Sequence, residues 1–347
     1  MILAVSLPDN LLEASVSIIS FVLGTKNYRQ ENINKFVHSV SQVGGERFYE
    51  ILYKAQLLGH LNQQDLEFLS LDYKIEQKFS LYNGYIKALQ KIQISELKEV
   101  IGTAVGNGLE PIILKGPGLW FSHYPNPSIR RVRDFDLQFR GRDELNIFCK
   151  LLCELGFENE EEELSSLYYE LGEYRRLFNS NLSHVEKTYI ENYDDTLHYC
   201  DFLIKGNSVI SKTIVEPHVA PFVFRDGSYP LFLDNYFVFH PYFKGAKTYA
   251  DFVLLPYLSI KIMQDFQNLF EGQTVKLKSL KLVADVIKVL SELSQVDVDK
   301  SISVASLWNC KRHLTLVMQM VSGLMPEVEF KGVSNNTDTL ANVCAYL

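Results

Sequence analysis

The chain has 347 residues, 47% of them hydrophobic, so it is long enough to bury one large core or two modest ones. Its formal net charge of −8 argues against wholesale binding to nucleic acid or to an anionic membrane, although a local basic patch is compatible with it. Five cysteines without paired spacing are typical of a reduced, cytoplasmic protein.

Residues 1–108 are predicted to form an N-terminal helical region, because apolar residues recur at three- and four-residue spacing. The expected helices cover Asn10–Leu23, Ile33–Val43, Glu46–Leu58, Leu71–Leu89 and Glu96–Val105. The apolar stretch Ala14–Gly24 is too short to span a bilayer, and we interpret it as a buried helix. This region carries no recognisable chemistry and is expected to be a platform.

Residues 109–245 are predicted to form a mixed α/β core. A strand at Pro111–Leu114 leads into the glycine turn Lys115-Gly116-Pro117-Gly118, a helical turn at Pro117–Ser122 and a second strand at Arg133–Phe139. The elements expected next are a helix capped by Asp143, a helical or irregular stretch over residues 164–187, and a hairpin of Leu197–Ile204 with Val209–Val219.

Residues 246–347 are predicted to form a C-terminal helical region. The expected helices are Phe252–Phe270, Lys276–Leu290 and Ser303–Val321.

Two acids interrupt the second strand of the core. In the alternation of a strand, Asp134 and Asp136 point to one face, and Phe135 and Leu137 to the other. Two carboxylates roughly 4–6 Å apart repel each other unless a cation lies between them. Mg²⁺ or Mn²⁺ suits such hard oxygen ligands. A bare Asp-x-Asp also occurs at solvated strand ends, but the glycine turn and the basic cluster that begins at Arg130 favour a metal site.

A third acid, Glu216, lies inside the otherwise apolar run Val209–Val219. Acids in buried strands are rare unless they are paired or bind a metal. Pro217 has no N–H for the ladder, which predicts a sheet edge or a strand end at this position. Glu216 is therefore a candidate third carboxylate.

The string from Leu114 to Leu137, LKGPGLWFSHYPNPSIRRVRDFDL, resembles the polymerase-beta-like nucleotidyltransferase superfamily, and more closely its bacterial NTP-transferase family 5. The matching pieces of that signature are Leu114-Lys115-Gly116, Tyr124-Pro125, Arg130 and Asp134-Phe135-Asp136-Leu137. The later Glu216-Pro217-His218 resembles the group's acid-hydrophobic-His pattern. The resemblance implies an α+β fold, in which a small mixed sheet with flanking helices lies between the two helical regions.

The resemblance also implies an activity: metal-dependent transfer of a nucleoside monophosphate from a nucleoside triphosphate, such as ATP, to a small molecule, peptide or protein. The implied catalytic and metal-binding residues, for a two-metal arrangement with Mg²⁺ or Mn²⁺, are Asp134, Asp136 and Glu216. The implied nucleotide-binding residues are Lys115, Gly116, Gly118, Arg130 and His218. Glu216 is a candidate for the general base as well as for a metal ligand.

Two other functions stay open at this point. An Asp-x-Asp pair that holds a metal on a diphosphate also serves glycosyl transfer from a nucleotide sugar. A non-catalytic module that binds nucleotide or a partner is the third reading, because Pro117 has no N–H to donate to a phosphate where the superfamily offers Gly or Ser. The acidic charge makes long nucleic acid a poor acceptor. The sequence leaves the acceptor and the oligomeric state undetermined.

Overall fold

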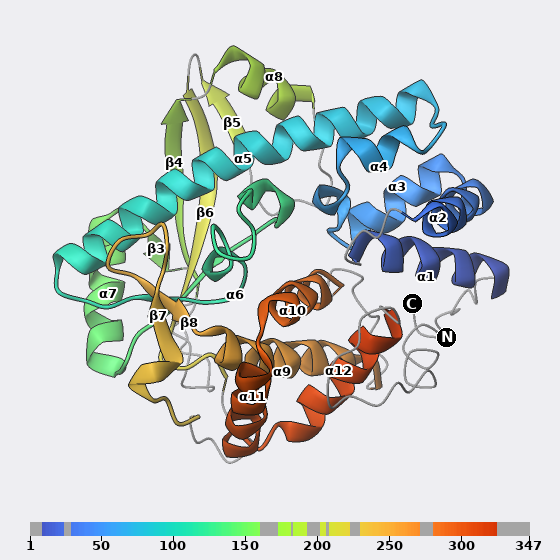
Figure 1. Ribbon diagram of the computed structural model, residues 1–347. Coiled ribbons are helices and arrows are strands. Elements are labelled where there is room, and N and C mark those ends of the chain that lie inside the picture. Colours follow the sequence, from blue (N-terminus) through green and yellow to red (C-terminus); the bar gives the residue numbers. More distant parts are fainter. Residues whose placement is uncertain are drawn as a thin grey trace. The chain divides into compact units, whose positions relative to one another are not determined.

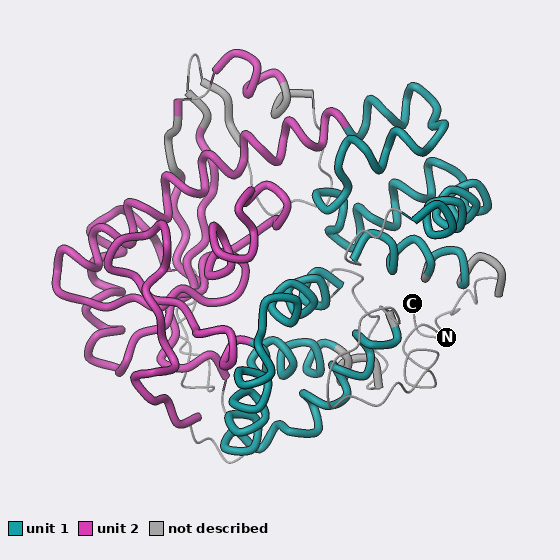
Figure 2. The backbone as a smooth tube through the Cα atoms, in the orientation of Figure 1, with its two compact units in different colours: residues 1–79, 255–347 teal, residues 80–254 magenta. Residues whose placement is uncertain are grey.

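The computed structural model describes residues 9–23, 29–159, 173–181, 183–192, 202–205, 208–222, 230–270 and 280–324 (Figure 1). The chain divides into two compact units, residues 1–79 with 255–347 and residues 80–254 (Figure 2). These boundaries fall inside two long helices, α5 (Tyr73–Gly106) and α9 (Asp251–Phe270). The division at residues 108 and 245 stays a prediction.

In its described residues, the first unit is built from helices. Besides parts of α5 and α9, these are α1 (Asp9–Leu23), α2 (Gln30–Val43), α3 (Gly45–Lys54), η1 (Leu58–His60), α4 (Gln63–Glu67), α10 (Leu280–Glu292), α11 (Gln295–Leu307) and α12 (Lys311–Leu324). The helical character predicted for the two ends of the chain is thus confirmed. The single helix expected over Ser303–Val321 is wrong, because the chain leaves helical geometry between α11 and α12. Asn309 there has a φ of 49°, a left-handed conformation that Asn tolerates.

The second unit contains a mixed sheet with flanking helices, which confirms the α+β fold. Its strands are β1 (Ile112–Ile113), β2 (Phe135–Gln138), β3 (Glu158–Asn159), β4 (Tyr174–Asn181), β5 (Phe202–Lys205), β6 (Ser208–His218), β7 (Phe237–Phe239) and β8 (Lys247–Tyr249). The sheet order is β3-β4-β6-β2-β1-β8-β7, and β5 pairs with the first residues of β6. The β1–β2 pair is antiparallel, whereas β2–β6 and β1–β8 are parallel. The shorter helical elements of this unit are α6 (Lys115–Gly118), η2 (Pro127–Ile129), α7 (Arg142–Glu154), α8 (His184–Asn192) and η3 (Asp234–Tyr236).

Strand β4 lies where the sequence predicted a helical or irregular stretch, so that prediction is wrong. The strand pairs antiparallel with β6 over its whole length, from Tyr174 opposite Val215 to Asn181 opposite Ser208. Its residues lack the regular alternation of a half-buried strand, so its conformation depends on the ladder with β6. By contrast, the predicted hairpin is confirmed, because β5 and β6 pair antiparallel with Lys205 opposite Ser208.

The helices expected at Leu71–Leu89 and Glu96–Val105 are one helix, α5, with 34 residues. The intervening residues Gln90–Ser95 include no Gly or Pro, and Gln and Lys are good helix formers, so nothing in the sequence interrupts the helix. None of the described helices is long and apolar enough to cross a membrane.

The core of the second unit lies between the sheet and the helices α5 and α7 (Figure 1). Strand β2 contributes Phe135 and Leu137, and β6 contributes Val215. The helical side chains that pack against them are Leu97, Val100, Ile101 and Ala104 of α5 and Leu145, Phe148 and Leu152 of α7. Because strand residues alternate between faces, this core turns the intervening Asp136 to the opposite face of the sheet.

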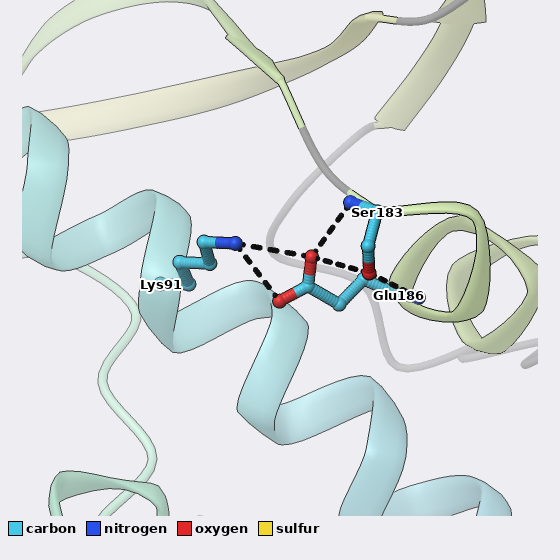
Figure 3. A network of polar contacts seen from close by, with 3 residues as sticks. All are labelled: Lys91, Ser183 and Glu186. Carbon is cyan, nitrogen blue, oxygen red and sulfur yellow. Dashed lines mark hydrogen bonds and ion pairs between the residues drawn. The ribbon is translucent and has the colours of Figure 1, made fainter.

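An ion pair joins helix α8 to α5, and the acid of this pair also caps α8 (Figure 3). Lys91 of α5 places its Nζ 3.2 Å from both carboxylate oxygens of Glu186. The same carboxylate accepts hydrogen bonds from the backbone N–H and the hydroxyl of Ser183, at 2.7 and 2.8 Å. Glu186 therefore serves both as the acid of a capping box and as the partner of Lys91.

On the core face, polar contact also joins α5 to β6. The Ser211 hydroxyl of β6 donates to Glu96 at 3.0 Å, and both side chains are buried. Burial raises the pKa of Glu96 to about 7, although the nearby hydroxyls of Thr213 and Ser211 and the positive charge of Arg176 lower it. The folded chain therefore keeps a proton on Glu96 between about pH 4.5 and 7 that the unfolded chain releases.

We predict that Glu96→Gln stabilises the protein at pH 8 and changes its stability little at pH 5. The sign follows from linkage: the native state binds the extra proton, so the free energy of unfolding of the wild type falls as pH rises through this window. The full difference is on the order of 3 kcal/mol, since one pKa unit corresponds to about 1.4 kcal/mol. Denaturant unfolding of both proteins at the two pH values measures it.

Glu76→Gln is the matched control, because Glu76 is an exposed acid on the same helix. Its stability should follow that of the wild type at both pH values. Parallel pH profiles for wild type and Glu96→Gln would show that Glu96 is ionised in the folded protein and would refute the prediction.

Candidate functional site

Strands β2 and β6 bring two acids and a histidine together on the sheet face opposite the core. In the parallel register, Asp136 lies beside Glu216 and Gln138 beside His218. One ligand atom from each of Asp136, Glu216 and His218 lies within 4.8 Å of the other two. Asp136 and His218 are buried and Glu216 is partly exposed. The group therefore combines three potential ligands in a site that is largely closed to solvent.

Asp136 is the electrostatic centre of this group, with a side chain only 1% exposed. Lys115 Nζ lies 2.6 Å from Asp136 Oδ1, and His218 Nε2 lies 3.0 Å from the same oxygen. Burial alone would raise the pKa of Asp136. The Lys115 ammonium and the hydrogen bond from His218 outweigh burial and hold that pKa well below its usual range. Asp136 is therefore a carboxylate at neutral pH.

Lys115 reaches Asp136 because the backbone turns sharply after β1. Lys115 has a φ of 51°, in the left-handed region that residues other than Gly and Asn rarely adopt. This conformation costs roughly 1–2 kcal/mol, so the ion pair with Asp136 and the packing of the turn must offset it. The Lys115 side chain is 29% exposed and can also meet a ligand from solvent.

The helical turn begins earlier than the sequence predicted. Helix α6 starts at Lys115 and ends at Gly118, so the expected helical turn at Pro117–Ser122 is wrong. Both glycines of the turn are packed against the protein. A Cβ on Gly116 would lie 2.8 Å from Val132 Cγ2, and one on Gly118 would lie 2.6 Å from the Ile113 carbonyl oxygen. The structure therefore requires these glycines for close packing of the turn, whatever the turn binds.

Arg130 lies beside the glycine turn and is only 3% exposed. Its Nη1 donates to the Arg131 carbonyl at 2.6 Å, and its own carbonyl accepts from Trp120 Nε1 at 3.2 Å. The guanidinium carbon would lie 3.5 Å from a Cβ on Gly116. Arg130 is therefore enclosed by the protein where it supports the turn, and its role in nucleotide binding stays a prediction.

Asp134 lies outside the group formed by Asp136, Glu216 and His218. Strand β2 begins at Phe135, so strand alternation does not determine where the Asp134 side chain points. Asp134 is partly exposed, and within the described part of the chain no hydrogen bond or ion pair engages its carboxylate. Its assignment as a metal ligand stays a prediction.

The residues present fit a divalent cation of the Mg²⁺ or Mn²⁺ class, since Asp136 and Glu216 offer hard oxygen ligands side by side. His218 fits best as the partner that orients Asp136. A carboxylate only accepts hydrogen bonds, so His218 Nε2 carries the hydrogen and donates it to Asp136 Oδ1. An imidazole that orients a metal-binding carboxylate is a common outer-shell arrangement.

Sequence reasoning missed two residues that contact the glycine turn. His240 Nε2 lies 3.1 Å from the Pro117 carbonyl oxygen, and Thr248 Oγ1 lies 3.3 Å from the Gly118 carbonyl oxygen. Each is more than a hundred residues from its partner. No local pattern identifies them, because only the parallel pairing of β1 with β8 brings them to the turn.

Comparison with known families gives one match. Residues 42–326, well over half of the chain, match the sequence model of a family described as an uncharacterised nucleotidyltransferase. This span includes the glycine turn and all three residues of the Asp136 group. The chain matches no curated protein and no solved structure.

We predict that Gly118→Ala destabilises the protein by about 1–3 kcal/mol, the usual cost of overpacking. Its new methyl group would meet the Ile113 carbonyl oxygen at 2.6 Å and Thr248 Oγ1 at 2.8 Å. Denaturant unfolding measures the change.

Gly102→Ala is the control, because Gly102 is an exposed position of α5 with no atom within 4 Å of its added Cβ. It should stabilise the protein by about 0.5–1 kcal/mol, the helix preference of Ala over Gly. Equal effects of the two substitutions would contradict the tight packing of the turn.

Proposed function

The chain belongs to this uncharacterised nucleotidyltransferase family, and on that premise we propose that it transfers a nucleoside monophosphate from a nucleoside triphosphate. The acceptor is a hydroxyl or similar group on a small molecule, peptide or protein. One observation carries the proposal beyond the family match: Asp136 and Glu216 lie side by side in register on the sheet, next to the glycine turn.

Asp136 and Glu216 would hold Mg²⁺ or Mn²⁺, with Asp134, the residue before β2, as a further carboxylate. When bound, such an ion supplies Lewis-acid polarisation of the phosphate and lowers the pKa of the attacking hydroxyl. Asp136 is suited to this task because its lowered pKa keeps it ionised at neutral pH. Glu216 is partly exposed and lies beside Asp136 in the parallel register of β2 and β6, so it can also accept the proton of the acceptor hydroxyl.

The proposed reaction is a displacement at the α-phosphorus of the nucleotide. The acceptor oxygen forms a bond to this phosphorus, the bond to the bridging oxygen breaks, and pyrophosphate leaves with the electron pair. The acceptor proton passes to the base, for which Glu216 is the candidate. Lys115 has a partly exposed ammonium beside Asp136 and would neutralise charge on the phosphates.

The remaining residues around the site would position the nucleotide. We propose that the backbone at Gly116 and Gly118 contacts phosphate oxygens. Arg130 would pack against the turn beside Gly116 and contribute positive charge. His218 would keep Asp136 oriented. We further propose that the protein acts in a bacterial cytoplasm, where the free thiols of Cys149, Cys153 and Cys310 would stay reduced.

Donor identity distinguishes this proposal from glycosyl transfer. A thermal-shift panel in Mg²⁺ and in Mn²⁺ should include the four nucleoside triphosphates and several nucleotide sugars. A donor present at about 100 times its Kd stabilises the protein by roughly 2.7 kcal/mol. We expect a metal-dependent shift with one or more triphosphates. A shift with nucleotide sugars alone would indicate glycosyl transfer, and no shift with any nucleotide would refute nucleotidyl transfer.

We predict that Glu216→Gln lowers kcat/KM by a factor of about 10³ or more, because loss of a metal-binding acid removes several kcal/mol of transition-state stabilisation. Asp136→Asn should do the same, but it also leaves Lys115 next to a neutral partner and is expected to lower stability. Glu216→Gln is therefore the more informative variant. Release of pyrophosphate with the donor found in the panel measures the activity.

Asp234→Asn is the control, because Asp234 is an acid of the same unit whose side chain is 91% exposed. It should keep wild-type activity and donor binding. Wild-type activity in Glu216→Gln would show that the register pair of Asp136 and Glu216 is not the catalytic site.

A further inference from the structure

We propose that the hairpin of β7 and β8 sets the geometry of the glycine turn, and that His240 is a positioning residue for the nucleotide. The second half of this inference rests on the proposed function, since it takes the turn to be part of the nucleotide site. The first half concerns the protein alone. Neither His240 nor Thr248 belongs to the sequence pattern that identified the site.

His240 is held in one tautomer. Its side chain is buried, and its Nδ1 lies 3.2 Å from the backbone nitrogens of both Tyr242 and Phe243. Backbone N–H groups only donate, so Nδ1 accepts, and the ring hydrogen is on Nε2. Nε2 therefore donates to the Pro117 carbonyl at 3.1 Å. Burial lowers the pKa of His240 to about 4 against the effect of that hydrogen bond, so the ring is neutral at pH 7.

The contact with Pro117 fixes a peptide plane at the centre of the turn. The Pro117 carbonyl accepts from His240 Nε2 and from the Trp120 N–H at 3.2 Å. Because the peptide unit is planar, fixing this carbonyl also fixes the direction of the Gly118 N–H. Pro117 has no N–H to donate, so the protein orients this part of the turn through hydrogen bonds to the Pro117 carbonyl.

Thr248 lies between the end of β1 and the last residue of the turn, and its single hydroxyl hydrogen is shared between two carbonyl oxygens. Its hydroxyl lies 3.1 Å from the carbonyl oxygen of Ile113, the last residue of β1, and 3.3 Å from that of Gly118, the last residue of α6. The hydroxyl is in reach because Thr248 lies beside Ile113 in the parallel β1–β8 pair. One hairpin therefore contacts the last residue of β1, the middle of the glycine turn and its last residue.

The hairpin is itself well anchored, as a positioning element must be. The backbone N–H of His240 donates to the Ala246 carbonyl at 3.0 Å, and the Ala246 N–H donates to the Phe243 carbonyl at 3.1 Å. Gly245 has a φ of 82°, and a Cβ there would lie 2.7 Å from Val105 Cγ1 of α5. The loop between β7 and β8 is thus closed on itself and packed against α5.

Amide hydrogen exchange of the full chain tests the role of the hairpin without any ligand. We expect His240→Leu to raise exchange at least tenfold at Gly116, Gly118 and Leu119. His240→Gln should stay within about threefold of wild type, because its amide N–H can still donate to the Pro117 carbonyl. Thr248→Val, which removes the hydroxyl, should also raise exchange there. Wild-type exchange at these amides in both His240→Leu and Thr248→Val would overturn the inference.

His313→Leu is the matched control. His313 is a partly exposed histidine of α12 whose Nδ1 has no hydrogen-bond partner in the described part of the chain. Exchange at the turn should be unchanged in this variant. Faster exchange there in His313→Leu as well would attribute the effect to general loosening and would overturn the specific role of His240.

Binding measurements test the second half of the inference. We expect His240→Leu to weaken binding of the nucleoside triphosphate at least tenfold, with His240→Gln within about twofold of wild type and Mn²⁺ binding in the absence of nucleotide unchanged. A merely structural role would weaken both ligands together. Unchanged nucleotide affinity in His240→Leu, despite a loosened turn, would overturn the positioning role. If the wild type binds no triphosphate at all, the proposed function fails and the positioning role fails with it, while hydrogen exchange still decides the role of the hairpin.

Discussion

The buried carboxylate of Asp136 is the constraint on which the site depends. An isolated ion in a protein interior costs several kcal/mol, so a carboxylate that is 1% exposed requires close compensation. Lys115 and His218 provide it through a single oxygen, Oδ1. The three residues come from α6, β2 and β6. The cluster of Asp136, Lys115 and His218 therefore forms only when the glycine turn and the strands β2 and β6 are all in place. The site thus depends on the fold.

The glycines of the turn have a structural reason that is independent of any ligand. They are required by neighbours within the protein, since any Cβ would overlap Val132 or the Ile113 carbonyl. Pro117 departs from the resemblance that identified the family, because it removes a donor. Pro117 still takes part in a hydrogen bond as an acceptor, because its carbonyl accepts from His240 in the loop between β7 and β8. The departure is accommodated by contacts that no motif describes.

The two faces of the sheet serve different purposes. Phe135, Leu137 and Val215 pack into the core against α5 and α7, and Asp136 alternates with them on the other face. Helix α5 also makes polar contacts across the core: Gln93 donates to the Val132 carbonyl at 2.9 Å, and Glu96 accepts from Ser211. These contacts hold the segment before β2 and the middle of β6. The strands that carry Asp136 and Glu216 are therefore held in place by contacts on the core face of the sheet, opposite the two acids.

Local signals in the sequence were enough to predict several elements. Apolar periodicity located most of the helices at the two ends of the chain, and a short apolar run placed a strand before the glycine turn. Asp136 alternated with the core residues Phe135 and Leu137, and Lys205-Gly206-Asn207 separated the two strands of a hairpin. The family signature is of the same kind, since most of it lies within 24 residues of continuous chain, from Leu114 to Leu137.

Which distant residues meet depends on how separate segments pair in the folded chain. Asp136 and His218 are 82 residues apart, and the parallel register of β2 with β6 brings them together. The same dependence on non-local pairing explains why β4 was missed and why His240 and Thr248 gave no signal. Asp134 precedes the first residue of β2, so the strand register does not place it in the Asp136 group. Register between distant strands depends on the burial of whole faces and on ladder partners elsewhere in the chain, and residues adjacent in sequence carry no record of it.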